Sequence, residues 1–331
     1  MITRARAEVK SDAFAGRARA ETCVGVRPLD PNESVHCANR IEEARLFLDL
    51  SNQFRENGWP DKAKRFAVRA LAIFEREAGA YHPDVVRVLL CLAAAREDLG
   101  DYARAGADYR RANDILDLTA DPRNLETERL RIQTIRGLAN VIRALGRDQQ
   151  AETMLKDALV LAERTFGCQN GDVAGALKDL GVHYRHTGAY EKASRLHRRA
   201  LSIAEITLGF EHAQTAAILH ELGVVEHARG QCAAGELFAR RSADIRQKTL
   251  GPDHPQVAAE FALIGALLEG QGKYDEAESL YRRALTIVER WFGPDHPEVA
   301  TIANHLARVP GRERDASVVT TFRSSGLTAA V

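Results

Sequence analysis

The chain has 331 residues, of which 45% are apolar and 6% aromatic, and its 46 basic residues balance its 46 acidic ones. This zero net charge argues against a dedicated nucleic-acid-binding protein, and no apolar run approaches the roughly 20 residues that a membrane helix needs. The five cysteines are widely spaced and form no CxxC motif, as expected for buried thiols in a reducing, cytoplasmic compartment.

Residues 1–36 are expected to form a flexible leader. Arginines and lysines are scattered among alanines in this segment, without the apolar stretch that a secretory signal requires. We therefore place the start of the folded region at about residue 37.

The central part of the chain is periodic. Gly209, Gly251 and Gly293 are 42 residues apart, and the sequence GPDHP at 251–255 returns at 293–297. A fixed period of this length indicates a stacked array of repeats, which favours a binding scaffold over an enzyme. We expect an all-α solenoid, because Ala, Leu, Arg and Glu are plentiful.

The clearest repeat, 251–292, predicts two amphipathic helices. The first begins at Pro255, because a proline in the first helical turn sacrifices no hydrogen bond, and ends near Gly272. The second runs from about Tyr274, with apolar residues at the three-and-four spacing of a helix. The glycine between the two helices recurs in every repeat: Gly58, Gly100, Gly146, Gly188, Gly230 and Gly272. Small residues also recur at fixed distances from it, for example Gly181 and Gly265, and would allow the helices to approach closely.

Six repeats are expected, followed by a single capping helix at 297–309 that covers the apolar edge of the last pair. The repeats fall at about 37–78, 82–119, 124–166, 171–208, 213–250 and 255–292. Residues 310–331 are expected to form a flexible tail.

The sequence resembles the tetratricopeptide repeat family, and its 42-residue unit resembles the kinesin light chain variety of that repeat. The family pattern LGxxHPxVA is matched by LGPDHPQVA at 250–258 and by FGPDHPEVA at 292–300. This resemblance implies a right-handed superhelix of helix-turn-helix pairs that binds a protein or peptide in a concave groove. It does not imply kinesin-type cargo binding, because the paired asparagines that hold a peptide in that family are replaced, for example by Leu90-Cys91 and Arg136-Gly137.

The family architecture places the first helix of each repeat on the concave face. The polar side chains that the register directs into this groove, and that we propose as its partner-binding residues, are Arg136, Asn140, Arg143, Lys178, Arg185, His186, His220 and His227. The third and fourth repeats contribute four cations and no acid at these positions, which predicts a basic groove. Arginine and lysine would hold the carboxylates of an acidic peptide or a free C-terminus. The alternative is an ordinary solvated helix face that carries a few cations.

Other chemistry receives little support. Arginine pairs recur on the second helices, but acidic residues alternate with them, so we expect no nucleic-acid partner. We find no metal-binding set among the 11 histidines and no nucleotide-binding or hydrolase motif, so we expect no metal, no cofactor, no catalytic residue and no enzyme. Three rival hypotheses stay open. The protein could be a regulator gated by a peptide or small ligand, a structural protein that self-associates through the ends of the solenoid, or an autoinhibited scaffold whose own tail, 315–331, folds back into the groove.

Overall fold

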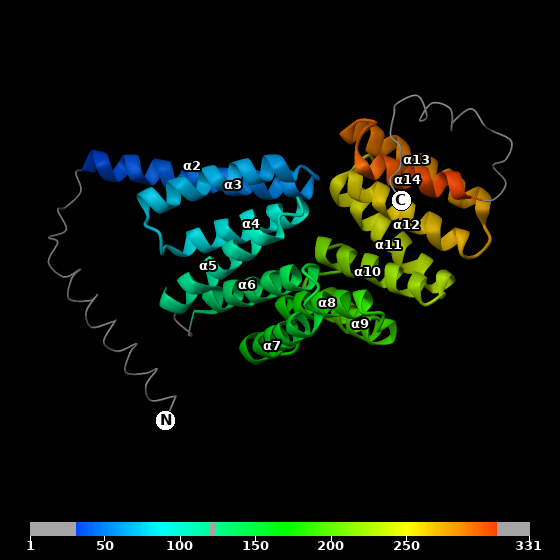
Figure 1. Cartoon of the computed structure of the whole chain (residues 1–331), viewed down its shortest axis with the longest axis horizontal. Helices are drawn as coiled ribbons and strands as arrows, with labels where there is room; N and C mark the ends of the chain where they lie inside the picture. Colours follow the sequence, from blue (N-terminus) through cyan, green and yellow to red (C-terminus); the bar gives the residue numbers. More distant parts are fainter. Residues whose placement is uncertain (1–30, 120–123, 310–331) are drawn as a thin grey trace.

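The computed structural model describes residues 31–119 and 124–309, which are helical apart from short turns. The helices in this part of the chain are α2 (Pro31–Glu56), α3 (Pro60–Glu77), α4 (Pro83–Asp98), α5 (Tyr102–Thr119), α6 (Leu125–Ala144), α7 (Asp148–Phe166), α8 (Gly171–His186), α9 (Tyr190–Thr207), α10 (Ala213–Ala228), α11 (Cys232–Leu250), α12 (Pro255–Glu269), α13 (Tyr274–Phe292) and α14 (Pro297–Arg308). Helices α2 to α13 form six hairpins that succeed one another along a curved array, as Figure 1 shows. The architecture is thus the all-α solenoid that the sequence predicts.

The two helices of each hairpin have different neighbours. We call the first one the A helix (α2, α4, α6, α8, α10 and α12) and the second one the B helix (α3, α5, α7, α9, α11 and α13). Successive A helices pack against one another, whereas each B helix contacts chiefly the A helices before and after it in the chain. The A helices therefore form the inner wall of the curve.

The A helices from α4 to α12 start with a side-chain cap. The ring nitrogen Nδ1 of His254 accepts a hydrogen bond from the backbone N–H of Gln256, and Pro255 occupies the first turn. Such a cap satisfies one of the N–H groups that a helix start leaves unpaired. His82, His212 and His296 cap α4, α10 and α14 in the same way, and Asn124 and Asn170 cap α6 and α8 with a side-chain oxygen.

Small residues allow the two helices of a hairpin to approach. A Cβ atom at Gly265 on α12 would lie 2.9 Å from the ring of Tyr281 on α13, and one at Gly181 would lie 2.5 Å from the ring of His197. The turn between α12 and α13 contains Gly272 with φ of 77°, a conformation that side chains with a Cβ rarely adopt. The glycines that the sequence analysis assigns to turns and to close contacts therefore serve those purposes.

The ends of the array differ from their predicted bounds at one position. Helix α2 begins at Pro31 rather than at residue 37, so the last residues of the predicted leader are helical. The rest of the predicted leader and the predicted tail lie outside the described residues. Helix α14 packs on α13 and buries Val299, Ile302 and Leu306 in the same apolar cluster as α11 to α13. The right-handed sense of the superhelix stays a prediction.

Candidate binding groove

Three hollows lie side by side on the A-helix wall. The first, of about 570 Å³, lies between α2, α4 and α6; the second, of about 450 Å³, lies between α6, α8 and α10. A third, of about 410 Å³, joins them, because it shares Arg55 and Leu90 with the first hollow and Arg136 and Lys178 with the second. Gln133 lines all three. Together they form one continuous groove along the first four repeats.

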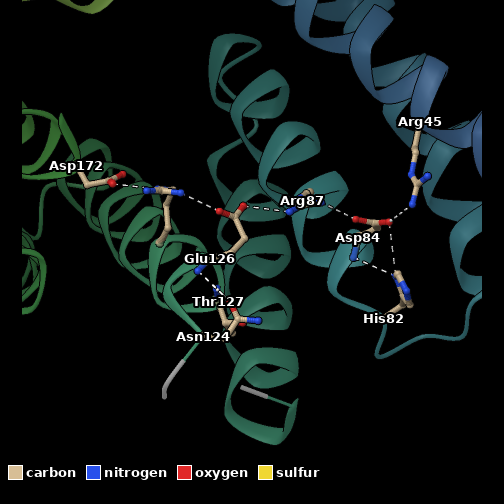
Figure 2. Close-up of polar contacts among 9 residues, drawn as sticks. Arg45, His82, Asp84, Arg87, Asn124, Glu126, Thr127 and Asp172 are labelled. Atoms are coloured by element: carbon tan, nitrogen blue, oxygen red, sulfur yellow. Dashed lines mark hydrogen bonds and ion pairs between the residues drawn. The ribbon is translucent and has the colours of Figure 1, made fainter. Parts of the chain in front are cut away.

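One edge of this groove carries a chain of ion pairs, shown in Figure 2. Acidic and basic side chains alternate along it and connect the middle of α2 with the starts of α4, α6 and α8. The pairs are Arg45–Asp84 at 3.6 Å, Arg87–Asp84 at 2.8 Å, Arg87–Glu126 at 3.0 Å, Arg129–Glu126 at 2.8 Å and Arg129–Asp172 at 2.9 Å. Because most of these side chains are half-exposed, each pair adds little stability by itself, and the series chiefly fixes the spacing of the repeats.

Deeper in the groove, the predicted cations have carboxylate partners. Arg136 Nε donates to Asp179 Oδ2 at 2.6 Å, and Lys178 Nζ lies 3.3 Å from the other oxygen of Asp179. Asp179 is buried; burial alone would raise its pKa, but Arg136 and Lys178 hold the pKa below its usual value. The sequence analysis counts no acid at the positions that it considers, but Asp179, which directly follows Lys178 on the same helix, faces these cations as well.

Carboxylates also pair with the groove cations of the next repeats. Arg185 Nε donates to Glu221 Oε2 at 3.2 Å, and His220 Nδ1 lies 2.9 Å from Glu260 Oε1. Glu260 is fully buried and also faces Arg246 at 3.2 Å. Arg136, Arg185 and His220 thus hold successive repeats together, which is a structural task that the sequence analysis did not assign to them.

Arg143 differs from these cations. It lies at the end of α6, and within the described residues its guanidinium has neither a hydrogen bond nor an ion pair, although its Nε atom is buried. Burial, together with the neighbouring Arg185, lowers the pKa of Arg143, and Glu97 and Asp179 oppose this effect only from a distance. His186 belongs to the same cluster, because Arg185 contacts its ring at 3.4 Å and burial with the nearby Arg143 lowers its pKa.

Asn140 faces the groove itself. It lies one turn before Arg143 on α6 and lines the third hollow. His227, the remaining predicted residue, lies in the last turn of α10, away from the residues that line the three hollows. Among the predicted residues, Arg136, Asn140 and Lys178 thus line the hollows. Arg143, Arg185 and His186 form a cluster beyond Asn140 that does not line them, and His227 lies apart.

Glu97 lines the third hollow, on the inner wall where the sequence register places it, although it is not among the predicted binding residues. Tyr109 donates its hydroxyl to Glu97 Oε1 at 2.5 Å, across the hairpin from α5 to α4. Burial raises the pKa of Glu97 to about 7, although the bond from Tyr109 opposes the shift. The equivalent pair, Tyr281 and Glu269, recurs in the sixth repeat and would have been visible as a repeated Glu–Tyr spacing of 12 residues.

The outer face, formed by the B helices, does not present a free basic stripe. In three of the four recurrent pairs the second arginine bonds a glutamate on the preceding B helix: Arg111 with Glu75, Arg199 with Glu163 and Arg241 with Glu205. In the fourth, Arg283 lies over the ring of Phe261. Each glutamate partner lies 36 residues earlier in the sequence. This pairing gives the repeated arginines a role in joining repeats.

The described residues offer no group of three or more side chains suited to a metal ion. Likewise, none of the helices in the described ranges combines the length and the apolar character needed to cross a membrane.

Two family models described as tetratricopeptide repeat match the sequence, one at residues 130–206 and 258–315 and the other at 215–256. Together they cover just over half of the chain. The chain belongs to the tetratricopeptide repeat family. No curated protein sequence matches it.

Solved structures with similar folds include kinesin light chain-like repeat proteins. BtubC (BKLC) from P. vanneervenii is 21% identical, with 73% of this chain and 93% of that chain covered and a TM-score of 0.54. A Podosopora anserina putative kinesin light chain with nearly identical TPR-like repeats, solved with a single substitution, is 22% identical, with 63% and 97% covered and a TM-score of 0.50. A Rap protein complexed with competence and sporulation factor is 14% identical, with 78% of each chain covered and a TM-score of 0.53. At identities this low, the comparison shows that this tetratricopeptide repeat protein has the same fold as these three structures.

Proposed function

We propose that this protein is an interaction scaffold that binds a peptide or protein partner in the groove formed by its A helices. Tetratricopeptide repeats generally mediate protein–protein interaction, and their scaffold is typically not enzymatic. The hollows of the first four repeats form one groove long enough for an extended segment. Because the wall is held in place by ion pairs between repeats, the partner bears most of the ordering entropy.

The observation that carries this proposal is the unpaired Arg143. A guanidinium with a buried Nε atom and without a partner has lost water contacts that no protein group replaces. A carboxylate from the partner, either an acidic side chain or a free C-terminus, would bind the two Nη groups, which are not buried, and neutralise this guanidinium. Asn140, one turn away, offers both a donor and an acceptor to the backbone of the same partner.

The balance of charge along the groove also bears on the partner. Arg136, Lys178 and Arg185 already face Asp179 and Glu221, so they are not free to bind several carboxylates. We therefore propose a partner with one well-placed carboxylate and otherwise polar contacts, rather than a run of acidic residues.

The test uses a displayed peptide library in two forms, with free and with amidated C-termini. Peptides selected on the wild type are titrated by calorimetry against Arg143→Gln and against Arg195→Gln, a matched change at an exposed arginine of α9. We expect Arg143→Gln to weaken binding about 10-fold or more, as the loss of one charge-assisted hydrogen bond implies. Arg195→Gln should leave binding unchanged. Equal affinities for all three proteins would place the site outside the groove.

A further inference from the structure

The first and last repeats of the array contact each other. The turn between α2 and α3 meets the start of α12 and the end of α13. We call this contact the clasp; it consists of Glu56, Asn57, Gly58 and Trp59 on one side, and His254, Gln256, Trp291 and Phe292 on the other. In Figure 1 the end of α2 and the start of α3 come close to α12 and α13, so that the curve of the solenoid returns to its beginning. Repeats of a solenoid otherwise contact only their neighbours.

The clasp contains specific hydrogen bonds. Trp291 Nε1 donates to the backbone oxygen of Asn57 at 3.2 Å, and Gln256 Nε2 donates to the backbone oxygen of Glu56 at 3.1 Å. The Nε2 atom of His254 lies 3.0 Å from Asn57 Oδ1. Since His254 Nδ1 accepts from the helix start, Nε2 carries the proton of the neutral ring and donates it to Asn57.

Aromatic side chains complete the contact. The rings of Trp59 and Phe292 meet edge to face with centroids 5.5 Å apart, and Trp291 meets His254 at 5.4 Å. A Cβ atom at Gly58 would lie 2.8 Å from the Phe292 ring, so a larger residue there would push the two ends apart. Both edge-to-face pairs adopt the geometry that aromatic rings prefer.

The sequence is unusual at the positions that form the clasp. The chain contains two tryptophans, and both are here. The residue after the turn glycine is Trp59 in the first repeat, and in the other five it is Asp101, Arg147, Ala189, Gln231 and Lys273. The position of Trp291 is a threonine in the three preceding repeats, namely Thr165, Thr207 and Thr249. Tryptophan therefore replaces small or polar residues only where the first and the last repeat meet.

The clasp is also less buried than the contacts between neighbouring repeats. His254 is 4% exposed, but Asn57, Trp59, Trp291 and Phe292 are only half-buried. Neighbouring repeats, by contrast, share fully buried side chains such as Leu219 and Tyr281. The clasp is thus specific in its hydrogen bonds but small, as is appropriate for a contact that opens while the repeats stay folded.

We propose that the clasp closes the six repeats into a ring in solution and opens reversibly without unfolding of the repeats. In the closed form it fixes the curvature of the A-helix wall, and in the open form the first repeat moves away from the last. This inference does not rest on the proposed peptide partner, because every contact in it lies within the chain.

The experiment uses tryptophan fluorescence without any ligand. Trp59→Lys and Trp291→Thr each place at the clasp a residue that other repeats hold there, so both variants should fold with wild-type helical circular dichroism. Each leaves one tryptophan as a reporter. If the clasp closes in solution, loss of one tryptophan exposes the other. The wild-type spectrum is then shifted to shorter wavelengths than the sum of the two variant spectra, and acrylamide quenches the remaining tryptophan faster.

Small-angle X-ray scattering and light scattering complete the test. The double variant Trp59→Lys/Trp291→Thr should have a larger radius of gyration than the wild type at the same monomeric mass. Leu237→Arg, which introduces at an exposed position of α11 the residue that the preceding repeat holds at 195, is the control and should change neither radius nor spectrum. Additive spectra together with an unchanged radius would overturn the clasp. A dimeric wild type that becomes monomeric in the double variant would also overturn it, because the ends would then pair between copies.

Discussion

Arg136 and Asp179 lie on successive A helices, 43 residues apart in the sequence, and the Nε atom of Arg136 donates to Asp179 Oδ2 at 2.6 Å. Their side chains are only 17% and 10% exposed. An ion pair this far from solvent is costly to break from one side, because the remaining charge has no water to replace its partner. The third and fourth repeats are therefore joined by this pair as well as by apolar packing.

We expect Asp179→Asn to lower the free energy of unfolding by about 3 kcal/mol, since it leaves Arg136 and Lys178 without their shared carboxylate. Urea denaturation at pH 7, followed by circular dichroism, measures this loss. The control is Asp61→Asn, which breaks an exposed pair with Lys64 and should cost less than about 1 kcal/mol. Similar losses in the two variants would contradict the structural role of Asp179.

Asp179→Asn should also differ from the wild type in how its stability depends on pH in acid. The pKa of Asp179 is lower in the folded protein than its ordinary value, so its contribution is present above that ordinary value and disappears as the pH falls through the lowered one. The gap in stability between wild type and Asp179→Asn should therefore be constant near neutral pH and shrink below about pH 4. A gap that stays constant down to about pH 3 would be inconsistent with a lowered pKa.

Gly137 allows α5 and α6 to approach each other. A Cβ atom there would overlap the ring of Tyr109, which is held by its bond to Glu97. We expect Gly137→Ala to destabilise the protein by about 1–3 kcal/mol through overpacking, although alanine is the better helix former. Gly106→Ala is the matched control, because its Cβ would meet a Val141 methyl at 3.4 Å, an ordinary contact. Thermal unfolding of both variants shows whether the steric clash with Tyr109 or the higher helix propensity of alanine dominates at Gly137.

Glu97 should make the protein less stable at high pH. Because burial raises its pKa to about 7, the fold favours the protonated carboxyl; this contribution is complete below the ordinary value of 4.5 and is lost as the pH rises through about 7. Glu97→Gln stays neutral and still offers an oxygen to Tyr109. At pH 8 we expect the variant to exceed the wild type by about 2 kcal/mol in free energy of unfolding, a value already reduced for partial solvent exposure. A difference that does not change between pH 4.5 and pH 8 would refute the assignment.

Protonation of His254 should open the clasp as the pH falls. Burial and, to a lesser extent, Arg246 lower its pKa, so the neutral ring is favoured when the clasp is closed, and this preference is lost as the pH falls below the ordinary value near 6.5. The protonated ring cannot accept from Gln256 N–H, and the helix start loses its cap. Tryptophan emission should therefore shift to longer wavelengths between pH 7.5 and pH 5. His254→Asn retains a cap of the kind found at Asn124 and Asn170, and in this variant the shift should be absent.

Much of this fold follows from local signals that repeat. The proline at 255 and the histidine before it mark the start of α12, and Gly272 marks the turn after it, because each position has one dominant conformational requirement. The start of α2 could not be read in this way. Pro31 carries no histidine before it and lies outside the 42-residue register, so the helix is longer than the repeat pattern indicates.

The groove was harder to predict than the helices. The register places Arg136, Arg143 and Arg185 on the inner wall, but which of them is free depends on acids in the next repeat. Asp179 and Glu221 stand 43 and 36 residues after Arg136 and Arg185, respectively, and these spacings become meaningful only when the stacking of the A helices is known. The contact of Trp59 with Phe292 depends on the curvature summed over all six repeats, which no local pattern contains.

An open solenoid can gain or lose a repeat at either end and keep all its remaining contacts, because each unit depends only on its neighbours. A solenoid whose first turn bonds the last hairpin has no such freedom. Inserting one further 42-residue unit would move Trp291 away from Asn57 by a full repeat, and deleting one would bring the ends into collision. A closed clasp, with its hydrogen bond between these two residues, thus fits the six repeats of the described part of the chain and no other number.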